Sequence, residues 1–187
     1  MKSLADKSHY FITLEAFADT FVPGEKRFPA DIAVAGAATG AGAVAAGAVD
    51  LLSASATGVS ESLGELVSML NEHAAEFAAA NGVSLDPSEP PFAALGFADR
   101  SELARRLTAP EHPEKEFWIL AALFCFMAFD TAAHVGTVNA ISDGHPGLAT
   151  IGFAAPDADG LWRFPDFSYG RQLARIHPGT LASGDPA

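Results

Sequence analysis

The amino-acid sequence predicts an all-α protein: a compact helical bundle around a central apolar helix, residues 112–139, with an irregular, aromatic-rich C-terminal tail, residues 146–187. Two observations predict this class. Apolar residues recur at three- and four-residue spacing over residues 9–21 and 60–80, which is the period of an amphipathic helix. Residues 117–129 form an unbroken apolar run, as expected for a helix that is surrounded by others.

The first helix is predicted to begin near His9. Ser8 can cap it, because its hydroxyl can accept a hydrogen bond from a free backbone amide of the first turn. The dipeptide Pro23-Gly24 should end it. One face then carries the apolar side chains Phe11, Leu14, Phe17, Ala18 and Phe21.

A second helix is predicted over residues 32–52, with Asp31 as its cap. Each of its glycines costs about 1 kcal/mol relative to alanine. Two interpretations stay open: small residues at four-residue spacing allow another backbone to approach closely, or the segment is a mobile lid. A phosphate-binding loop is disfavoured, because no β-branched strand precedes the glycines and no Lys-Ser/Thr follows them. The glycines are Gly36, Gly40, Gly42 and Gly47.

The third helix is predicted over residues 60–80, with Gly82 as its C-cap. His73 lies off its apolar stripe, which favours a solvated side chain. Asp99 and Glu102 have the spacing of a capping box and should open a short fourth helix.

The central helix should start at Pro113, because proline at the first helical position loses no needed hydrogen bond. Its apolar run of 13 residues is shorter than the roughly 20 that cross a membrane, so a buried helix is preferred to a span. Cys125 in this run is read as a buried, inert thiol, with a catalytic thiolate as the alternative.

Composition sets further limits on the chain. The 187 residues, 49% of them hydrophobic, can bury one core, so we expect a single domain over residues 1–187. A formal net charge of −12 argues against nucleic acid and anionic membranes as partners. One cysteine and the lack of an export leader at the start of the sequence lead us to expect a cytoplasmic location.

The strongest candidate catalytic residues are Asp130, His134 and His145. Asp130 and His134 are four residues apart and would share one face of the central helix. A carboxylate that orients an imidazole makes a general base. Two other interpretations stay open: the pair satisfies its own hydrogen bonds, or it binds a metal ion. Metal binding ranks last because no third converging ligand is evident, and no metal ligand or cofactor site is predicted.

Four aromatic and charged residues are candidates for substrate binding. Trp118 and Phe126 of the central helix can line an apolar pocket. Tyr169 and Arg171 lie in the tail, where such a mixture suits a recognition surface and suits docking of the tail equally well.

The sequence resembles a known family in several blocks. These are Leu14-Glu-Ala-Phe-Ala-Asp-Thr-Phe-Val-Pro-Gly24, Pro29-Ala with the small-residue segment to Asp50-Leu-Leu52, Gly160-Leu-Trp-Arg-Phe-Pro-Asp-Phe-Ser-Tyr-Gly170, and Ile176-His-Pro-Gly179. They are similar to the small (gamma) subunit of gluconate dehydrogenase. The resemblance implies a small helical companion of a flavin-dependent dehydrogenase that assists maturation or export, and it carries no catalytic motif. The sequence departs from the family pattern in two places. Arg171 stands where the family has a second glycine after Tyr-Gly, and the twin-arginine leader that is common in the family is missing.

We therefore hypothesise an accessory or maturation subunit that binds a flavin-dependent oxidoreductase through its aromatic tail and has no catalytic activity of its own. The alternative is a small cofactor-free enzyme, an isomerase, cyclase or lyase, that acts on a hydrophobic metabolite with Asp130 and His134 as its acid-base pair. A carrier of a hydrophobic small molecule is a third hypothesis, which would need the pocket without the base.

Overall fold

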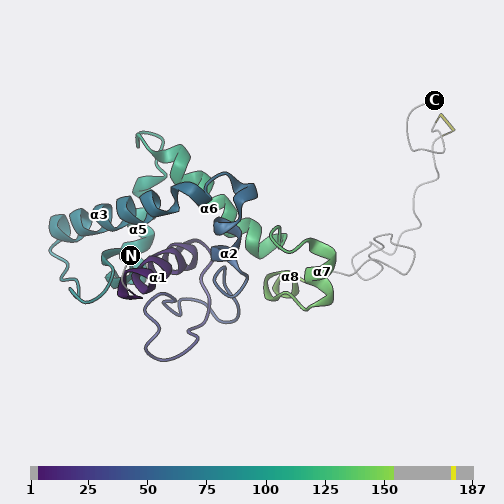
Figure 1. The fold of residues 1–187 in the computed structure, drawn as a ribbon, viewed down its shortest axis with the longest axis horizontal. Helices are drawn as coiled ribbons and strands as arrows, with labels where there is room; N and C mark the ends of the chain where they lie inside the picture. The colour runs from purple at the N-terminus through teal and green to yellow at the C-terminus, as the bar shows by residue number, and fades with distance from the viewer. Residues whose placement is uncertain (1–3, 154–177, 180–187) are drawn as a thin grey trace. The chain divides into compact units, whose positions relative to one another are not determined.

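The computed structural model describes residues 4–153 and 178–179, and there the chain folds into helices and loops without a β-strand (Figure 1). The predicted all-α class is confirmed. The chain divides into two units, Met1–Phe153 and Ala154–Ala187, and the fold described below is that of the first unit. Its elements in order are α1 (Leu4–Phe21), α2 (Ala48–Ser53), the 3₁₀ turns η1 (Ser55–Thr57) and η2 (Ser60–Ser62), α3 (Leu63–Asn81), α4 (Pro91–Ala94), α5 (Phe97–Leu107), α6 (Lys115–Asp130), α7 (Thr137–Ser142) and α8 (Pro146–Thr150).

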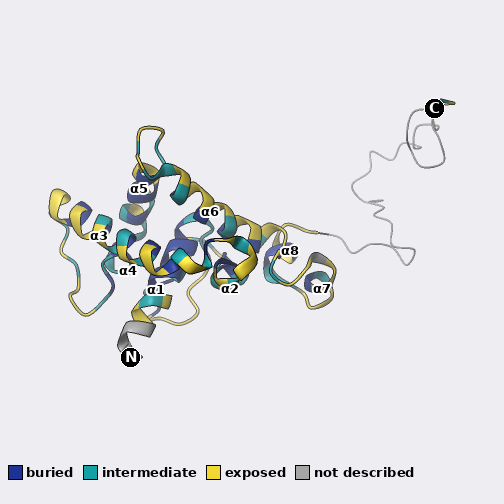
Figure 2. Ribbon diagram, turned by 45° about the horizontal axis from the view of Figure 1, so that its top comes forward, coloured by how far each residue is buried: buried dark blue, intermediate teal, exposed yellow. Residues whose placement is uncertain are grey.

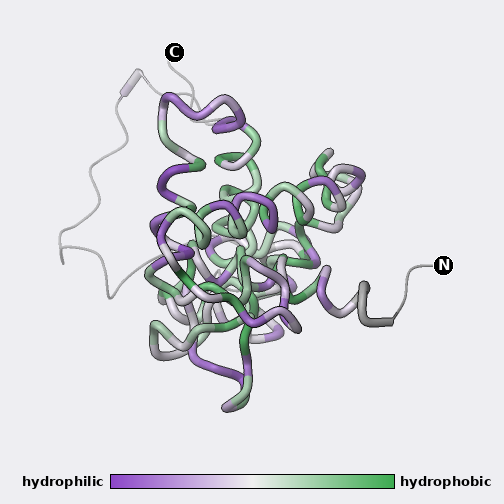
Figure 3. The backbone as a smooth tube through the Cα atoms, turned by 90° about the vertical axis from the view of Figure 1, so that its left-hand side faces the viewer, coloured by the Kyte–Doolittle hydropathy of each residue, from purple (hydrophilic) through white to green (hydrophobic). Residues whose placement is uncertain are grey.

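The core lies between α1, α2, α3, α4, α5 and α6. Its centre is aromatic: the ring of Phe17 lies 6.2 Å from that of Trp118 and 6.5 Å from that of Phe92, measured between centroids. All three side chains are fully buried. Along the backbone, stretches of hydrophobic and hydrophilic residues follow one another (Figure 3).

The first helix begins earlier than predicted. Since α1 starts at Leu4, Ser8 lies inside the helix and does not cap it. The predicted end is confirmed, because the helix stops at Phe21, ahead of Pro23.

The helix predicted over residues 32–52 is wrong for most of its length. Only α2 forms, and residues 22–47 are a loop of turns and bends. Three of its glycines adopt positive φ, namely 74° at Gly36, 80° at Gly40 and 82° at Gly47, which a right-handed helix does not allow. These glycines therefore form turns. A helix-propensity scale does not detect this, because it treats each glycine only as a modest cost to a helix.

Two buried charged side chains hold this loop. The carboxylate of Asp19 on α1 accepts hydrogen bonds from the amides of Gly24 (3.1 Å) and Ala35 (2.9 Å). The guanidinium of Arg100 on α5, which is 3% exposed, donates to four backbone carbonyls. These belong to Ile32, Ala33, Ala93 and Leu95.

The third predicted helix is confirmed in α3, with Gly82 as its C-cap at φ 68°. The capping box predicted for Asp99 and Glu102 is wrong: α5 begins at Phe97 without a side-chain cap. Glu102 instead pairs with Arg105 and Arg106 on the same helix.

The central helix is shorter than predicted. It ends at Asp130, and Ala132 (φ 49°) and Gly136 (φ 80°) break the chain before α7. The tail, expected to be irregular from residue 146, first forms α8. Gly147 allows this short helix to approach the end of α6, since a Cβ there would overlap the carbonyl of Phe129.

α6 is buried on one side only, which corrects the expectation that other helices surround it (Figure 2). Small side chains and one tryptophan face the core, and large apolar side chains face outward. The inward residues are Trp118, Ala121, Ala122, Cys125 and Ala128. The outward residues, called below the outer face of α6, are Ile119, Leu120, Leu123, Phe126 and Met127.

Among the described residues, no helix has the length and apolar character to cross a membrane.

Candidate functional site

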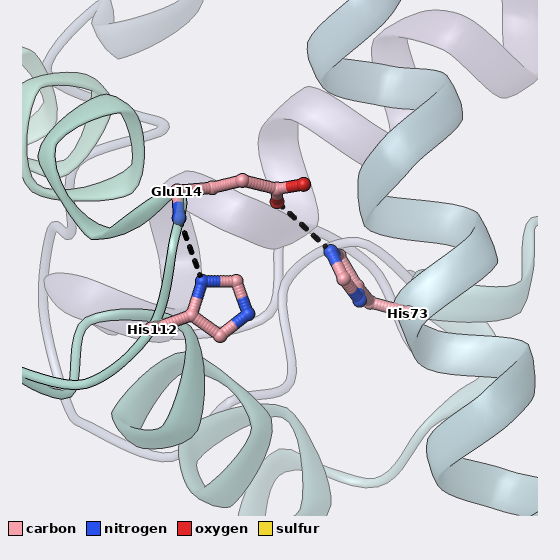
Figure 4. Close-up of side chains that lie close together, drawn as sticks. All are labelled: His73, His112 and Glu114. Carbon is pink, nitrogen blue, oxygen red and sulfur yellow. Dashed lines mark hydrogen bonds and ion pairs between the residues drawn. The ribbon is translucent and has the colours of Figure 1, made fainter.

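Two histidines and a glutamate converge where α3 meets the start of α6 (Figure 4). Nε2 of His73, on α3, lies 3.1 Å from Oε2 of Glu114. Glu114 is the N-cap residue of α6, and its backbone amide donates to Nδ1 of His112 over 3.2 Å. The rings of His73 and His112 contact each other edge to face, with centroids 5.6 Å apart.

The core supports the carboxylate of Glu114. The indole N–H of the buried Trp118 donates to Oε2 of Glu114 over 3.1 Å, the same oxygen that His73 contacts. The hydrogen bond from His73, with that of Trp118, holds the pKa of Glu114 below its ordinary value, and partial burial opposes this. Glu114 is therefore ionised at neutral pH and accepts hydrogen bonds from two ring systems.

The three side chains have the composition of a metal-ligand set. One ligand atom from each of His73, His112 and Glu114 lies within 4.8 Å of the others, and all three residues are partly buried. His73 was predicted to be solvated, and the structure instead places it in this cluster. The spacing of His112 and Glu114 is visible in the sequence, but nothing local points to His73 as their partner.

A surface depression of about 440 Å³ adjoins this cluster. Three carboxylates lie along it, so its rim is acidic and favours cations. The lining residues are Ser62, Glu65, Met69, Pro113, Glu114, Glu116 and Phe117.

The structure separates two of the predicted catalytic residues. Asp130 ends α6, whereas His134 lies in the loop that follows, so they do not share the face of one helix. His134 instead lies beside His145, with ring centroids 6.2 Å apart. Burial lowers the pKa of His134, with His145 acting in the same direction and Asp50 against it. Its Nδ1 is buried without a hydrogen-bond partner among the described residues.

His145 has a structural role in the same region. Its Nδ1 accepts from the amide of Leu148 and caps α8, and its Nε2 lies 3.0 Å from the carbonyl of Ala46. These contacts assign the ring proton to Nε2. His145 thereby connects α8 to the glycine-rich loop.

The predicted binding residues do not form one pocket in the described part of the chain. Trp118 is fully buried, so its ring fills the core. Phe126 is 42% exposed on the outer face of α6, with its ring 6.2 Å from that of Phe21. Tyr169 and Arg171 lie outside the described residues. Burial raises the pKa of Cys125 to about 12, which fits the inert thiol expected.

The fold and the site define a small all-α protein that carries a cluster of two histidines and one glutamate. A family model described as a family of unknown function (DUF5987) matches residues 8–187, and the chain belongs to this family. No curated protein and no solved structure matches the chain.

Proposed function

We propose that this protein is a non-catalytic accessory or maturation subunit of a flavin-dependent oxidoreductase, and that it docks through the outer face of α6. The observation that supports this is the exposure of the face itself. Each of its five large apolar side chains is between 38% and 50% exposed. The apolar run to which they belong contains no charged residue over residues 117–129.

The spacing of these side chains suits contact with another protein. Ile119, Leu123 and Phe126 follow one another at four and three residues, so they form a stripe along one side of the helix. A helix that presents such a stripe is a common ligand for an apolar groove. Contiguous apolar patches on soluble proteins are typical of interaction sites.

The choice of partner rests on the sequence resemblance to the gamma subunit of gluconate dehydrogenase. Subunits of that family accompany flavoproteins, and they carry no catalytic motif. We propose the cytoplasm as the location, on the grounds that the single cysteine is a buried thiol with no intramolecular partner. The enzyme hypothesis receives less support, because Asp130 and His134 lie on different elements.

Affinity purification of the tagged full chain from its native cells tests the proposal. We expect a flavoprotein in stoichiometric amount, recognised by flavin absorbance and identified by mass spectrometry. Leu123→Glu should abolish its recovery, because the substitution places a charge in the middle of the apolar stripe.

Phe28→Glu is the matched control. Phe28 is also a large exposed apolar residue, but it lies in the loop that precedes α2, so the variant should retain the flavoprotein. Three results would count against the proposal: a chain recovered alone, equal recovery with Leu123→Glu, or a second copy of the chain as the partner that Leu123→Glu releases.

A further inference from the structure

We propose that His73, His112 and Glu114 bind one divalent transition-metal ion, for which zinc is the best match, and that the ion links α3 to the start of α6. This inference uses other residues than the proposed docking face and does not depend on it.

The donor set selects the class of metal. Two imidazole nitrogens and one carboxylate oxygen are ligands that suit zinc and its neighbours in the first transition series. Magnesium and calcium prefer oxygen donors throughout, so two histidines argue against them. Three protein ligands leave a fourth position for water, as in open zinc sites.

The geometry is close to that of a bound ion. Two ligands at about 2.0–2.1 Å from a tetrahedral zinc are about 3.3 Å apart, and Nε2 of His73 already lies 3.1 Å from Oε2 of Glu114. All three ligand atoms lie within 4.8 Å of one another. The third ligand therefore has to move by no more than about 1.5 Å to complete the site.

His112 is the ligand that adjusts. Its Nδ1 now accepts the backbone amide of Glu114. A metal on Nδ1 would replace that amide, and a metal on Nε2 would turn Nδ1 into a donor that faces the amide. Either mode breaks this contact, so binding of the ion is coupled to a small rearrangement of residues 112–114, just ahead of the regular part of α6.

The surroundings of the cluster favour a cation. The Trp118 indole donates to the Glu114 carboxylate, which is the kind of support that orients a metal ligand from outside the coordination sphere. Glu65 and Glu116 add negative charge along the adjoining depression. The ammonium group of the nearby Lys115 donates a hydrogen bond to the carbonyl of Pro110. In this arrangement Lys115 is not paired with the Glu114 carboxylate.

The test is a titration of the full chain with Zn²⁺ after treatment with a chelator, read by competition with a chromophoric zinc indicator. We expect one ion per chain and a rise in the melting temperature with Zn²⁺. Co²⁺ should bind in its place and give the visible absorption of a site with nitrogen and oxygen ligands. His73→Ala and Glu114→Gln should each weaken binding by about 100-fold, and Trp118→Phe by about 10-fold.

His9→Ala and Glu25→Gln are the controls, because they remove an exposed histidine and an exposed carboxylate that belong neither to the three ligands nor to the depression. Both should bind Zn²⁺ within about 2-fold of the unaltered chain, well below the loss typical of a ligand or its support. The inference is overturned if no ion binds at one per chain. It is equally overturned if His73→Ala binds as tightly as His9→Ala while its circular dichroism shows a folded chain.

Discussion

Nε2 of His73 lies 3.1 Å from Oε2 of Glu114, although 41 residues separate them in the sequence. The contact joins the middle of α3 to the N-cap residue of α6, at the edge of the aromatic core. Trp118 donates to the same oxygen. A single carboxylate is thus positioned by one buried and one partly buried aromatic ring.

This contact makes stability depend on pH in the acid range. The hydrogen bond from His73 lowers the pKa of Glu114 in the folded chain. A lowered carboxyl pKa contributes stability that is complete above the unfolded value of about 4.3 and is lost as the pH falls through the folded value. Glu114→Gln should therefore destabilise the chain at neutral pH, and this difference should shrink progressively as the pH falls below about 4.3.

The magnitude should be small, because the Glu114 side chain is 37% exposed, and we expect less than about 1 kcal/mol. Urea unfolding at several pH values measures it, with Glu116→Gln as the control. A difference between wild type and Glu114→Gln that stays constant from neutral to acid pH would contradict the expectation.

Arg100 should be the most sensitive charged residue of the fold. It is 3% exposed and satisfies four carbonyls, two of them on the loop that follows α1. Arg100→Ala leaves these groups without their donor, and we expect a loss of at least about 3 kcal/mol. Arg100→Lys should cost more than about 1 kcal/mol, because an ammonium cannot reproduce the planar fork.

Guanidinium denaturation compares these variants with Arg105→Lys. Arg105 is exposed, and among the described residues its guanidinium pairs with Glu102 on its own helix, so its substitution should fall within about 0.5 kcal/mol of wild type. Similar losses for Arg100→Lys and Arg105→Lys would mean that the loop is held by other contacts.

Gly42 and Gly64 give a matched test of the glycine-rich loop. A Cβ on Gly42 would lie 2.5 Å from the carbonyl oxygen of Val22 and 2.6 Å from the amide nitrogen of Gly24. Gly42→Ala should therefore destabilise the chain by about 1–3 kcal/mol. A Cβ on Gly64, in α3, meets nothing within 4 Å, so Gly64→Ala should stabilise by about 0.4–1 kcal/mol.

Melting temperatures of the two variants should move in opposite directions. If the melting temperature of Gly42→Ala equals that of the wild type, residues 22–24 do not pack against residue 42 as closely as described above.

Helices were predictable from the sequence where apolar residues recur on one face only, as in α3. In α3 the apolar residues recur at helical spacing, and Gly82 supplies the positive φ of the C-cap; both signals are local. The loop over residues 22–47 was not predictable in this way. Its hydrogen-bond partners are distant: Asp19 lies 16 residues from Ala35, and Arg100 lies 67 from Ala33.

The candidate site shows the same division. His112 and Glu114 are neighbours in sequence, but their partner on α3 is found only once the helices pack. The pairing expected for Asp130 and His134 required the helix to continue, and it ends at Asp130. A turn at Ala132 with φ 49° has no signature in residue type, because alanine is the best helix former.

The thiol of Cys125 should be unreactive in the folded chain. Burial raises its pKa to about 12, and its Sγ lies 3.4 Å from the carbonyl of Ala121. At about pH 8 the thiolate fraction is then roughly a thousandfold below that of a free cysteine. A thiol reagent should react at that slower rate with the native chain and at the ordinary rate in denaturant. Rapid reaction of the native chain would instead favour the alternative of a reactive thiolate.

Leu123 tests whether the outer face of α6 is exposed, with Leu70 on α3 as the reference for a buried leucine. Leu70 on α3 is fully buried, whereas Leu123 is 50% exposed. Leu70→Ala should cost about 2–5 kcal/mol through lost burial and the cavity it leaves. Leu123→Ala should cost less than about 1 kcal/mol, because its side chain already contacts water. Guanidinium denaturation of the full chain measures both. If the two losses are equal, the outer face of α6 is covered within the chain itself, and the docking surface has to be sought elsewhere.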